Sequence, residues 1–313
     1  MFEREREMGR SWTKSDIPDL SGKRVVITGG NSGIGFEAAL GFAEKGAEVI
    51  IASRNIGRGE AAASKISQIV PDARISVMEL NLSDLASVRA FAQEFSSNYQ
   101  SLDMLINNAG IMMPPLSFTK DGFEAQFGTN HLGHFALTGL MLGFLKNGPN
   151  SRVVTVSSLA AHHASIYFDN LDGSKWYKRY KFYGQSKLSN MLFGKELDNK
   201  LKEHNLEVKS IICHPGITNT NLASRNSGKD LNRLFQTISR AITQPAGMGA
   251  LPTMHAATES SLKGGEYIGP DGKKKRKGYP VVDPVIERIF NKETAKRLWA
   301  VSEELTGISY DFS

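Results

Sequence analysis

Short apolar runs rich in β-branched residues recur along the chain and predict buried strands. They lie at residues 24–28, 47–53, 74–80, 102–107, 151–158 and 207–215. The runs are apolar nearly throughout rather than alternating with polar residues, which is typical of strands that helices cover on both faces. Segments of helical length fill the gaps between them. Because strands and helices alternate, the pattern predicts an α/β fold with a doubly wound parallel sheet flanked by helices.

The same pattern predicts one domain. The sequence has no internal repeat and no linker rich in Pro, Gly or Ser that would separate two cores. Residues 1–20 are interpreted as a polar N-terminal arm, and residues 21–313 as a single domain with a C-terminal helical extension at 264–313. In that extension Leu298, Val301 and Leu305 are spaced to share one face of a helix, and we expect it to pack on the main body.

Composition is that of an ordinary globular protein and gives no indication of a nucleic-acid site. Of the 313 residues 40% are hydrophobic and 22% charged, which is ordinary for a globular domain. The net charge is +6, but Lys and Arg are mostly interleaved with Asp and Glu. The exception is the run KKKRK at Lys273–Lys277, which has turn residues on both sides. We interpret it as a solvated loop and predict no nucleic-acid site.

Cysteine usage and the N-terminus bear on the compartment. Cys213 is the only cysteine, so no internal disulfide is possible and a reducing compartment is expected, most simply the cytoplasm. The N-terminus is charged, and no stretch approaches the roughly 18 apolar residues of a membrane span. We therefore predict neither secretion nor a transmembrane segment.

A glycine-rich turn follows the first predicted strand. The segment Thr28–Gly35 reads TGGNSGIG and runs into a helical stretch. Such a turn brings backbone close to a pyrophosphate and directs helix N-terminal N–H groups at the anion. The candidate cofactor-binding residues in it are Gly29, Asn31, Ser32, Gly33, Ile34 and Gly35. A turn that binds nothing is the alternative, and a glycine pattern alone is weak evidence.

The end of the second predicted strand indicates which dinucleotide would bind. An acid near that point takes the ribose hydroxyls of NAD, whereas a nearby Arg accommodates the 2′-phosphate of NADP. Here the strand ends at Ser53 and Arg54. Ser53 has no charge to repel a phosphate, and Arg54 can bind one through charge-assisted hydrogen bonds. NADP(H) is therefore favoured over NAD(H).

At this point the sequence resembles the short-chain dehydrogenase/reductase family. The motifs that carry the resemblance are TGGNSGIG at 28–35, NNAG at 107–110, TNHLG at 129–133, VSS at 156–158, YGQSK at 183–187 and HPGITNT at 214–220. They stand in the family's order, and the resemblance covers roughly residues 20–260. The tail WAVSEELTG resembles the retinol dehydrogenase-like branch and its bacterial relatives, so we expect a soluble member of that branch with a Rossmann-type fold.

The resemblance implies a catalytic group of Asn130, Ser158, Tyr183 and Lys187. Tyr183 and Lys187 stand four apart, so on a helix they share a face, and a nearby ammonium lowers the pKa of a phenol. Tyr183 would then exchange a proton with the substrate oxygen. By resemblance, Ser158 binds that oxygen, Lys187 also holds the nicotinamide ribose, and Asn130 anchors a water chain. Ser157 competes with Ser158, and alignment of the pair with the family favours Ser158.

The resemblance extends the cofactor site beyond the glycine turn. It assigns the adenine side to Asn81 and Leu82, and the ribose side to Asn108, Ala109 and Gly110. Asn81 replaces the acid that the family usually has there. The nicotinamide loop would comprise Pro215, Gly216, Ile217, Thr218 and Thr220, with Thr220 the better-placed hydroxyl by spacing. Tyr183 and Lys187 also contact the cofactor in the family. The alternatives are a simple strand-end turn at 108–110, a Pro-Gly turn after a strand at 215–220, and an ordinary surface helix pair at Tyr183 and Lys187.

An unusually long segment separates Ser158 from Tyr183 and suggests the substrate. Its aromatic residues, together with the methionines after NNAG, suit an apolar pocket for a lipophilic aldehyde, ketone or alcohol. The candidate pocket residues are Met112, Met113, His162, Tyr167 and Trp176. The alternative, that these aromatic residues merely close the surface of the fold, stays open here.

Other functional classes are less well supported. A metal site at His131 and His134, or at His162 and His163, lacks an accompanying carboxylate or cysteine cluster, and we expect no metal. A reductase of a large conjugated ring, resembling protochlorophyllide reductase, and a non-catalytic NADP(H)-sensing protein are the alternatives. The intact catalytic group favours an enzyme with a small-molecule substrate. By resemblance, a homodimer would pair through residues 120–146 and 182–204.

Overall fold

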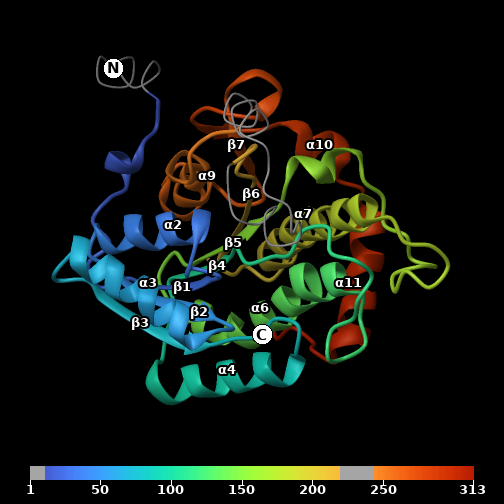
Figure 1. Ribbon diagram of the computed structural model, residues 1–313, viewed down its shortest axis with the longest axis horizontal. Helices are drawn as coiled ribbons and strands as arrows, with labels where there is room; N and C mark the ends of the chain where they lie inside the picture. The colour runs from blue at the N-terminus through green and yellow to red at the C-terminus, as the bar shows by residue number, and fades with distance from the viewer. Residues whose placement is uncertain (1–10, 219–242) are drawn as a thin grey trace.

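One twisted eight-stranded sheet forms the centre of the computed structural model, which describes residues 11–218 and 243–313 (Figure 1). The strand order is β3-β2-β1-β4-β5-β6-β7-β8, and only β8 is antiparallel to its neighbour. The strands are β1 (Arg24–Thr28), β2 (Glu48–Ser53), β3 (Arg74–Glu79), β4 (Met104–Asn107), β5 (Arg152–Val156), β6 (Lys209–Cys213), β7 (Tyr267–Pro270) and β8 (Pro280–Val282). The predicted doubly wound parallel sheet is confirmed, with β1–β6 inside the six predicted runs.

The apolar character of the strands follows from burial on both faces. In β1, Val25 and Ile27 belong to one core cluster, whereas Val26 between them belongs to another. In β2, Ile51 and Ile50 divide in the same way. Successive side chains of a strand point to opposite faces, so a strand between two helical layers needs apolar residues at every position.

Helices form the two outer layers. The helices are α2 (Gly33–Ala43), α3 (Ile56–Ile69), α4 (Leu85–Asn98), α5 (Ala125–Phe127), α6 (Gly133–Lys146), α7 (Arg179–Glu203), α9 (Ala246–Thr258), α10 (Val285–Ile289) and α11 (Lys292–Thr306). Side chains of α2, α3 and α9 pack in the first core cluster, and those of α4, α6 and α7 in the second. Figure 1 shows the sheet between these layers.

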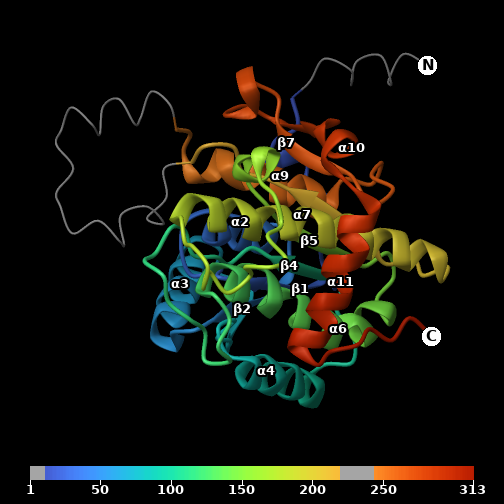
Figure 2. The same cartoon turned by 90° about the vertical axis from the view of Figure 1, so that its right-hand side faces the viewer.

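The C-terminal extension contains the predicted helix and two strands that were not predicted. The helix is α11, which lies beside α6 and α7 (Figure 2). Its Trp299 contacts Phe135 of α6 and Phe193 of α7, with ring centroids 5.1 and 5.9 Å apart. Strands β7 and β8 escaped prediction because they are short and lie among Gly, Pro and Lys.

This packing bears on the predicted dimer. The predicted pairing segments correspond to α5–α6 and α7, and α11 covers part of both. Among the described residues of α6 and α7, Tyr180 is the one large apolar side chain that is exposed. Pairing through these helices would therefore bury little apolar surface, and the homodimer stays a prediction.

The predicted N-terminal arm is partly packed on the core, whereas the basic run lies in a turn as interpreted. Residues 1–10 of the predicted arm lie outside the described residues, but Ile17 and Leu20 are buried, so residues 11–20 partly join the core. The run Lys273–Lys277 lies in the turn between β7 and β8, where Lys273 and Lys274 are exposed. No helix in the described part of the chain combines the length and apolarity that a membrane crossing requires.

Candidate active site

The candidate residues gather at one edge of the sheet because each group follows a parallel strand. The glycine turn follows β1, Ser53 ends β2, and the NNAG motif, Ser158 and the Pro215–Thr218 loop come after β4, β5 and β6. The carboxyl ends of parallel strands share an edge, and ligands of open α/β sheets bind there.

The turn after β1 requires glycine at two of its positions, Gly29 and Gly35. Gly29 has φ of +66°, and a Cβ on Gly35 would lie 2.5 Å from the carbonyl oxygen of Gly29. Helix α2 begins directly after this turn, and its first turn carries no acidic residue. A backbone cradle that ends in a helix N-terminus suits a phosphate group, so the residues present fit the predicted dinucleotide.

The NNAG motif is tied to this turn by hydrogen bonds. The backbone N–H groups of Asn108 and Ala109 both donate to Oγ1 of Thr28 at 2.9 Å. The Asn108 amide also donates to the Thr28 carbonyl at 2.8 Å. A Cβ on Gly110 would lie 3.1 Å from Oδ1 of Asn130 and 3.5 Å from Nζ of Lys187. The motif therefore connects the glycine turn to the predicted catalytic residues.

The residues predicted for the adenine side lie at or just after the ends of β2 and β3, and they differ in exposure. Ser53 is buried and its hydroxyl donates to the Asn55 carbonyl at 3.0 Å, whereas Arg54 is exposed and able to reach solvent. Oδ1 of Asn81 accepts hydrogen bonds from the N–H and hydroxyl of Ser83, at 3.2 and 2.7 Å. Leu82 is buried against Gly133. Oδ1 of Asn81 is thus engaged within its own turn.

Ser158 and Tyr183 interact through their side chains, which places two of the predicted catalytic residues together. The Ser158 hydrogen bond lowers the pKa of Tyr183, but burial is the larger effect and raises it. The expected lowering of the phenol pKa is therefore not seen. The structure gives the reason, since Nζ of Lys187 donates to the Val156 carbonyl at 3.0 Å and burial holds the Tyr183 phenol in its neutral form.

Lys187 is itself strongly perturbed. It is 4% exposed on α7, and burial lowers its pKa from 10.5 to about 8. The hydroxyl of Ser157 already has a partner within the protein, because it donates to the Lys187 carbonyl at 2.7 Å. Ser158 is half-buried and faces Tyr183. Of the two competing serines, Ser158 is the one whose hydroxyl contacts Tyr183, and its catalytic role stays a prediction.

Asn130 lies in a π-helical turn, Gly128–Leu132, immediately before α6. Its Oδ1 accepts from the Ile111 N–H at 2.8 Å, and its amide donates to the Ile111 carbonyl at 3.0 Å and to Ser186 Oγ at 2.9 Å. Its own carbonyl accepts from Nδ1 of His134 at 2.9 Å. π-helical turns are frequent at functional sites. Here the turn joins the NNAG segment to α7.

The Pro215–Thr218 loop has a left-handed glycine at its centre. Gly216 has φ of +66°, and the Thr218 hydroxyl donates to the Pro215 carbonyl at 3.0 Å. The adjoining Gln244 donates its side-chain N–H to the same carbonyl at 2.8 Å. Thr220, the predicted nicotinamide hydroxyl, lies outside the described residues.

Two of the five predicted pocket residues, Tyr167 and Trp176, lie in the aromatic segment between Ser158 and Tyr183. The rings of Tyr167 and Trp176 are 4.8 Å apart, and Trp176 is 40% exposed. Met112 is half-buried and Met113 exposed, and the Met113 N–H donates to Oε1 of Gln126 at 2.8 Å. His162 lies elsewhere, with its ring 5.8 Å from that of His214.

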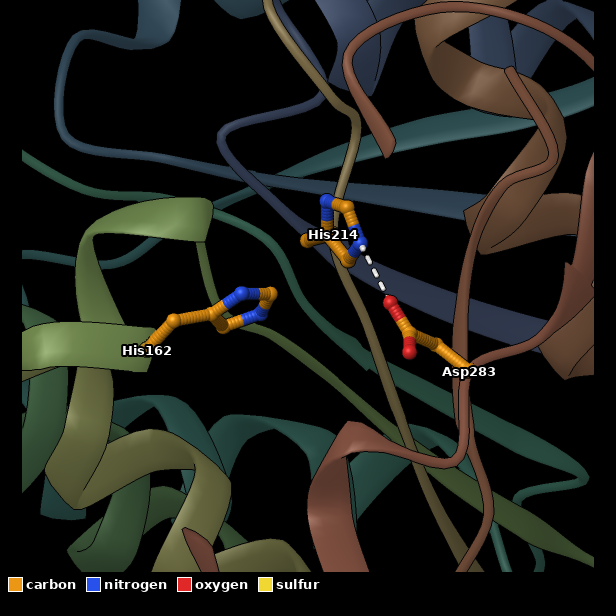
Figure 3. A group of neighbouring side chains, drawn as sticks. All are labelled: His162, His214 and Asp283. Carbon is orange, nitrogen blue, oxygen red and sulfur yellow. Dashed lines mark ion pairs between the residues drawn. The ribbon is translucent and has the colours of Figure 1, made fainter. Parts of the chain in front are cut away.

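Of the histidines considered for a metal, His131 and His134 are buried and hydrogen-bonded, whereas His162 is half-buried and His163 is exposed. Burial lowers the pKa of His131 to about 3 and that of His134 to about 4. His131 is paired with Ser302 at 2.8 Å, and His134 with Thr28 at 2.9 Å. A different group, His162, His214 and Asp283, does converge (Figure 3). Sequence reasoning missed it because Asp283 follows β8, which was not predicted.

A doubly wound sheet with a glycine cradle, and with Tyr183, Lys187 and Asn130 buried beside a half-buried Ser158, is typical of an oxidoreductase that works with a nicotinamide cofactor. The model of the short chain dehydrogenase family matches residues 23–230. The chain is 43% identical to mouse retinol dehydrogenase 12 over 296 residues, which cover 93% of this chain and 89% of that protein. Human retinol dehydrogenase 11 is 39% identical over 308 residues, 98% of this chain and 92% of that protein.

Among solved structures, a putative uncharacterized protein from Mycobacterium paratuberculosis is similar, with a TM-score of 0.79 and 38% identity. The match covers 96% of this chain and all of that one. The chain therefore belongs to the short-chain dehydrogenase family and resembles its retinol dehydrogenases. It is an oxidoreductase that acts on alcohol or carbonyl groups.

Proposed function

We propose that this protein is an NADP(H)-dependent oxidoreductase that moves a hydride between nicotinamide and a carbonyl or alcohol carbon of a lipophilic substrate. The observation that carries the proposal is the group of buried Tyr183, Lys187 and Asn130 with the half-buried Ser158: Asn130 and Lys187 lie beside Gly110, and Ser158 contacts Tyr183. Titratable groups whose pKa is shifted by burial, as it is for Tyr183 and Lys187, are concentrated at functional sites, and these lie at the edge where ligands of such sheets bind.

The chain's own residues divide the work. The cradle from Gly29 to Gly35 would hold the pyrophosphate, and Arg54 the 2′-phosphate that distinguishes NADP from NAD. The bound nicotinamide supplies or accepts the hydride. By resemblance, Lys187 would hold its ribose, and the Pro215–Thr218 loop its carboxamide.

Proton transfer is the task of Tyr183. Because burial raises its pKa, the phenol is protonated at neutral pH and suited to donate a proton to a carbonyl oxygen as the carbonyl is reduced. Ser158 would hold the same oxygen, as its contact with Tyr183 indicates. In the oxidative direction a Tyr183 phenolate would accept the hydroxyl proton of the alcohol and become a phenol, and the Lys187 ammonium would stabilise the phenolate before that step. Asn130 fixes Ile111 and Ser186 around this group, and by resemblance it anchors the water chain that resupplies the proton.

The aromatic segment indicates the substrate class. Tyr167, Trp176, Met112 and Met113 offer apolar surface in the segments that follow NNAG and Ser158. The relatives named retinol dehydrogenases support a long apolar alcohol or aldehyde. We further propose that residues 21–313 act as one domain and that the chain, with its single cysteine, works in the reducing cytoplasm.

The test is cofactor oxidation with a panel of aldehydes and ketones of increasing apolar length, using NADPH and NADH in parallel. We expect turnover with NADPH that rises with chain length, weaker turnover with NADH, and loss of both in Tyr183→Phe. Binding of NADPH without turnover of any carbonyl would contradict the proposal and favour a non-catalytic sensor.

A further inference from the structure

Three buried polar atoms converge behind the Pro215–Thr218 loop. One ligating atom each from His162, His214 and Asp283 lies within 4.8 Å of the others (Figure 3). Nε2 of His162, Nε2 of His214 and Oδ2 of Asp283 are all buried, and none makes a direct hydrogen bond to the described residues. Buried polar atoms without partners cost free energy, so their convergence calls for a physical reason.

The other nitrogen of His214 reveals the protonation of the ring. The backbone N–H of Gly216 donates to Nδ1 of His214 at 3.2 Å. Because Nδ1 accepts a hydrogen bond, the proton of the neutral imidazole is on Nε2. Burial lowers the pKa of His214, which keeps the ring neutral. The Nε2–H then faces the Asp283 carboxylate, whose Oδ2 is 3.8 Å away.

This protonation argues against a metal at the cluster. A metal ion on Nε2 of His214 would move the proton to Nδ1, where it would face the Gly216 N–H. The positive charges of Lys275 and Arg288 also act on the histidines of the cluster and would oppose a cation. A hydrogen-bonded cluster of His162, His214 and Asp283, called here the joint, suits the three atoms better. In it the Nε2–H of His214 donates a hydrogen bond to the carboxylate, directly or through one bridging water.

The joint connects the loop to the C-terminal extension. Asp283 comes directly after β8, and the carbonyl of Arg276, in the turn between β7 and β8, accepts the Ile217 N–H at 2.8 Å. A Cβ on Gly216 would lie 2.3 Å from that same carbonyl oxygen. The β7–β8 hairpin therefore supports the loop at two places, directly through Arg276 and indirectly through Asp283 and His214.

We propose that His214 is a positioning residue of the cofactor site, which fixes Gly216 through Nδ1 and is itself held through Nε2 by Asp283 and His162. The proposal rests on the proposed function of the Pro215–Thr218 loop as the nicotinamide loop. It gives the extension a role in cofactor binding: the hairpin sets the shape of a loop that is far from it in sequence.

The test distinguishes the contribution of Nδ1 of His214 from that of Nε2. His214→Ala removes both, whereas His214→Asn keeps an acceptor for the Gly216 N–H, since an Asn side chain accepts from the backbone N–H two residues on. Hydrogen exchange of the Gly216 amide is measured without cofactor, and the NADPH dissociation constant by fluorescence. We expect His214→Ala to increase both by about 3- to 10-fold, the value of one hydrogen bond. His214→Asn keeps the contact with Gly216 but loses the contacts of Nε2, so it should increase both by about 3-fold, and by less than His214→Ala measured beside it.

The support for the ring is tested with Asp283→Asn and His162→Gln, with His163→Gln as the matched control because His163 is exposed. The first two should each accelerate exchange of the Gly216 amide by about 3-fold, and the control should not change it. These variants also keep the proposal testable if His214→Ala does not fold.

Several results would overturn the proposal. They are unchanged Gly216 exchange in His214→Ala, exchange in His214→Asn as fast as in His214→Ala, and faster exchange with an unaltered NADPH dissociation constant. One equivalent of transition metal in the purified protein that is lost in His162→Gln would also overturn it. Because exchange is read without cofactor, the joint can be established even if the proposed hydride transfer fails.

Discussion

The catalytic group and the aromatic segment are neighbours in sequence, but they are held in different ways. Asn130 is fully buried, and Lys187 and Tyr183 are 4% and 8% exposed. In the aromatic segment Trp176 is 40% exposed and Tyr167 is half-buried. Hydrogen bonds fix the side chains of Asn130 and Lys187, whereas the side chains of Tyr167 and Trp176 are held by ring contacts. We infer that the chemistry is rigidly specified and that the shape of the pocket can adapt to the substrate.

The largest effect on activity is expected from a change in the catalytic group, which is the rigid region of the comparison. Tyr183→Phe removes the proton donor and leaves the ring volume unchanged, so kcat for carbonyl reduction should fall by about 10²- to 10⁴-fold. NADPH binding should remain. Tyr180→Phe, on the exposed first turn of the same helix, is the matched control and should retain full activity. Residual activity of Tyr183→Phe near wild type would remove Tyr183 from the mechanism.

A second prediction separates function from stability at Lys187. Its pKa falls from 10.5 to about 8 on folding, so the unfolded chain binds more protons between these pH values. The folded state is therefore penalised below pH 8 and gains stability as the pH rises towards 10.5. Lys187→Met should abolish activity yet raise the free energy of unfolding at neutral pH by about 2 to 3 kcal/mol.

The pH dependence provides the control for this prediction. Urea unfolding at several pH values should show that the wild type approaches the variant in stability as the pH rises from 8 to 10.5. The Val156 carbonyl keeps a donor in the variant, because the Asn190 amide also donates to it at 3.2 Å. A variant less stable than wild type across the whole range would show that the burial of Lys187 is not penalised.

A third prediction concerns cofactor choice at the rim of the rigid region. Arg54→Ala should weaken NADPH binding by about 10- to 100-fold, the value of charge-assisted hydrogen bonds, and leave NADH binding nearly unchanged. Fluorescence titration with both cofactors measures this. Arg58→Ala, another exposed arginine close by in sequence, is the comparison. Equal weakening of NADH would mean that Arg54 does not recognise the 2′-phosphate.

The smallest effect on activity is expected from a change in the aromatic segment, which is the adaptable region of the comparison. Trp176→Ala should raise KM for a long-chain aldehyde by about 3- to 10-fold, because a half-exposed ring contributes only part of its burial energy. The KM for a short aldehyde and the NADPH dissociation constant should change little. If both aldehydes were affected equally, Trp176 would serve folding of the segment rather than substrate contact.

The sequence was sufficient to predict the strands that carry the site. Runs such as RVVIT are apolar at every position because both faces of β1 are covered, and this local signal does not depend on distant residues. The glycine turn was equally clear, since only glycine fits beside the Gly29 carbonyl. α11 could be predicted from the spacing of its apolar residues.

What could not be predicted depends on contacts between distant segments. The raised pKa of Tyr183 reflects burial by the whole fold, whereas the spacing to Lys187 suggested a lowered one. Strands β7 and β8 are too short for a periodic signal, and so Asp283 could not be placed beside His214. The HPG motif could have drawn attention to His214, but its partner follows a hairpin that only the structure reveals.

The most direct test of the account is transfer of label from NADPH deuterated at the transferable position of its nicotinamide, with a long-chain aldehyde and the wild-type enzyme. The account predicts that deuterium appears on the carbinol carbon of the alcohol product and that Tyr183→Phe forms this product far more slowly. Alcohol formation without deuterium, or NADPH binding with no alcohol formed from any aldehyde tested, would contradict it.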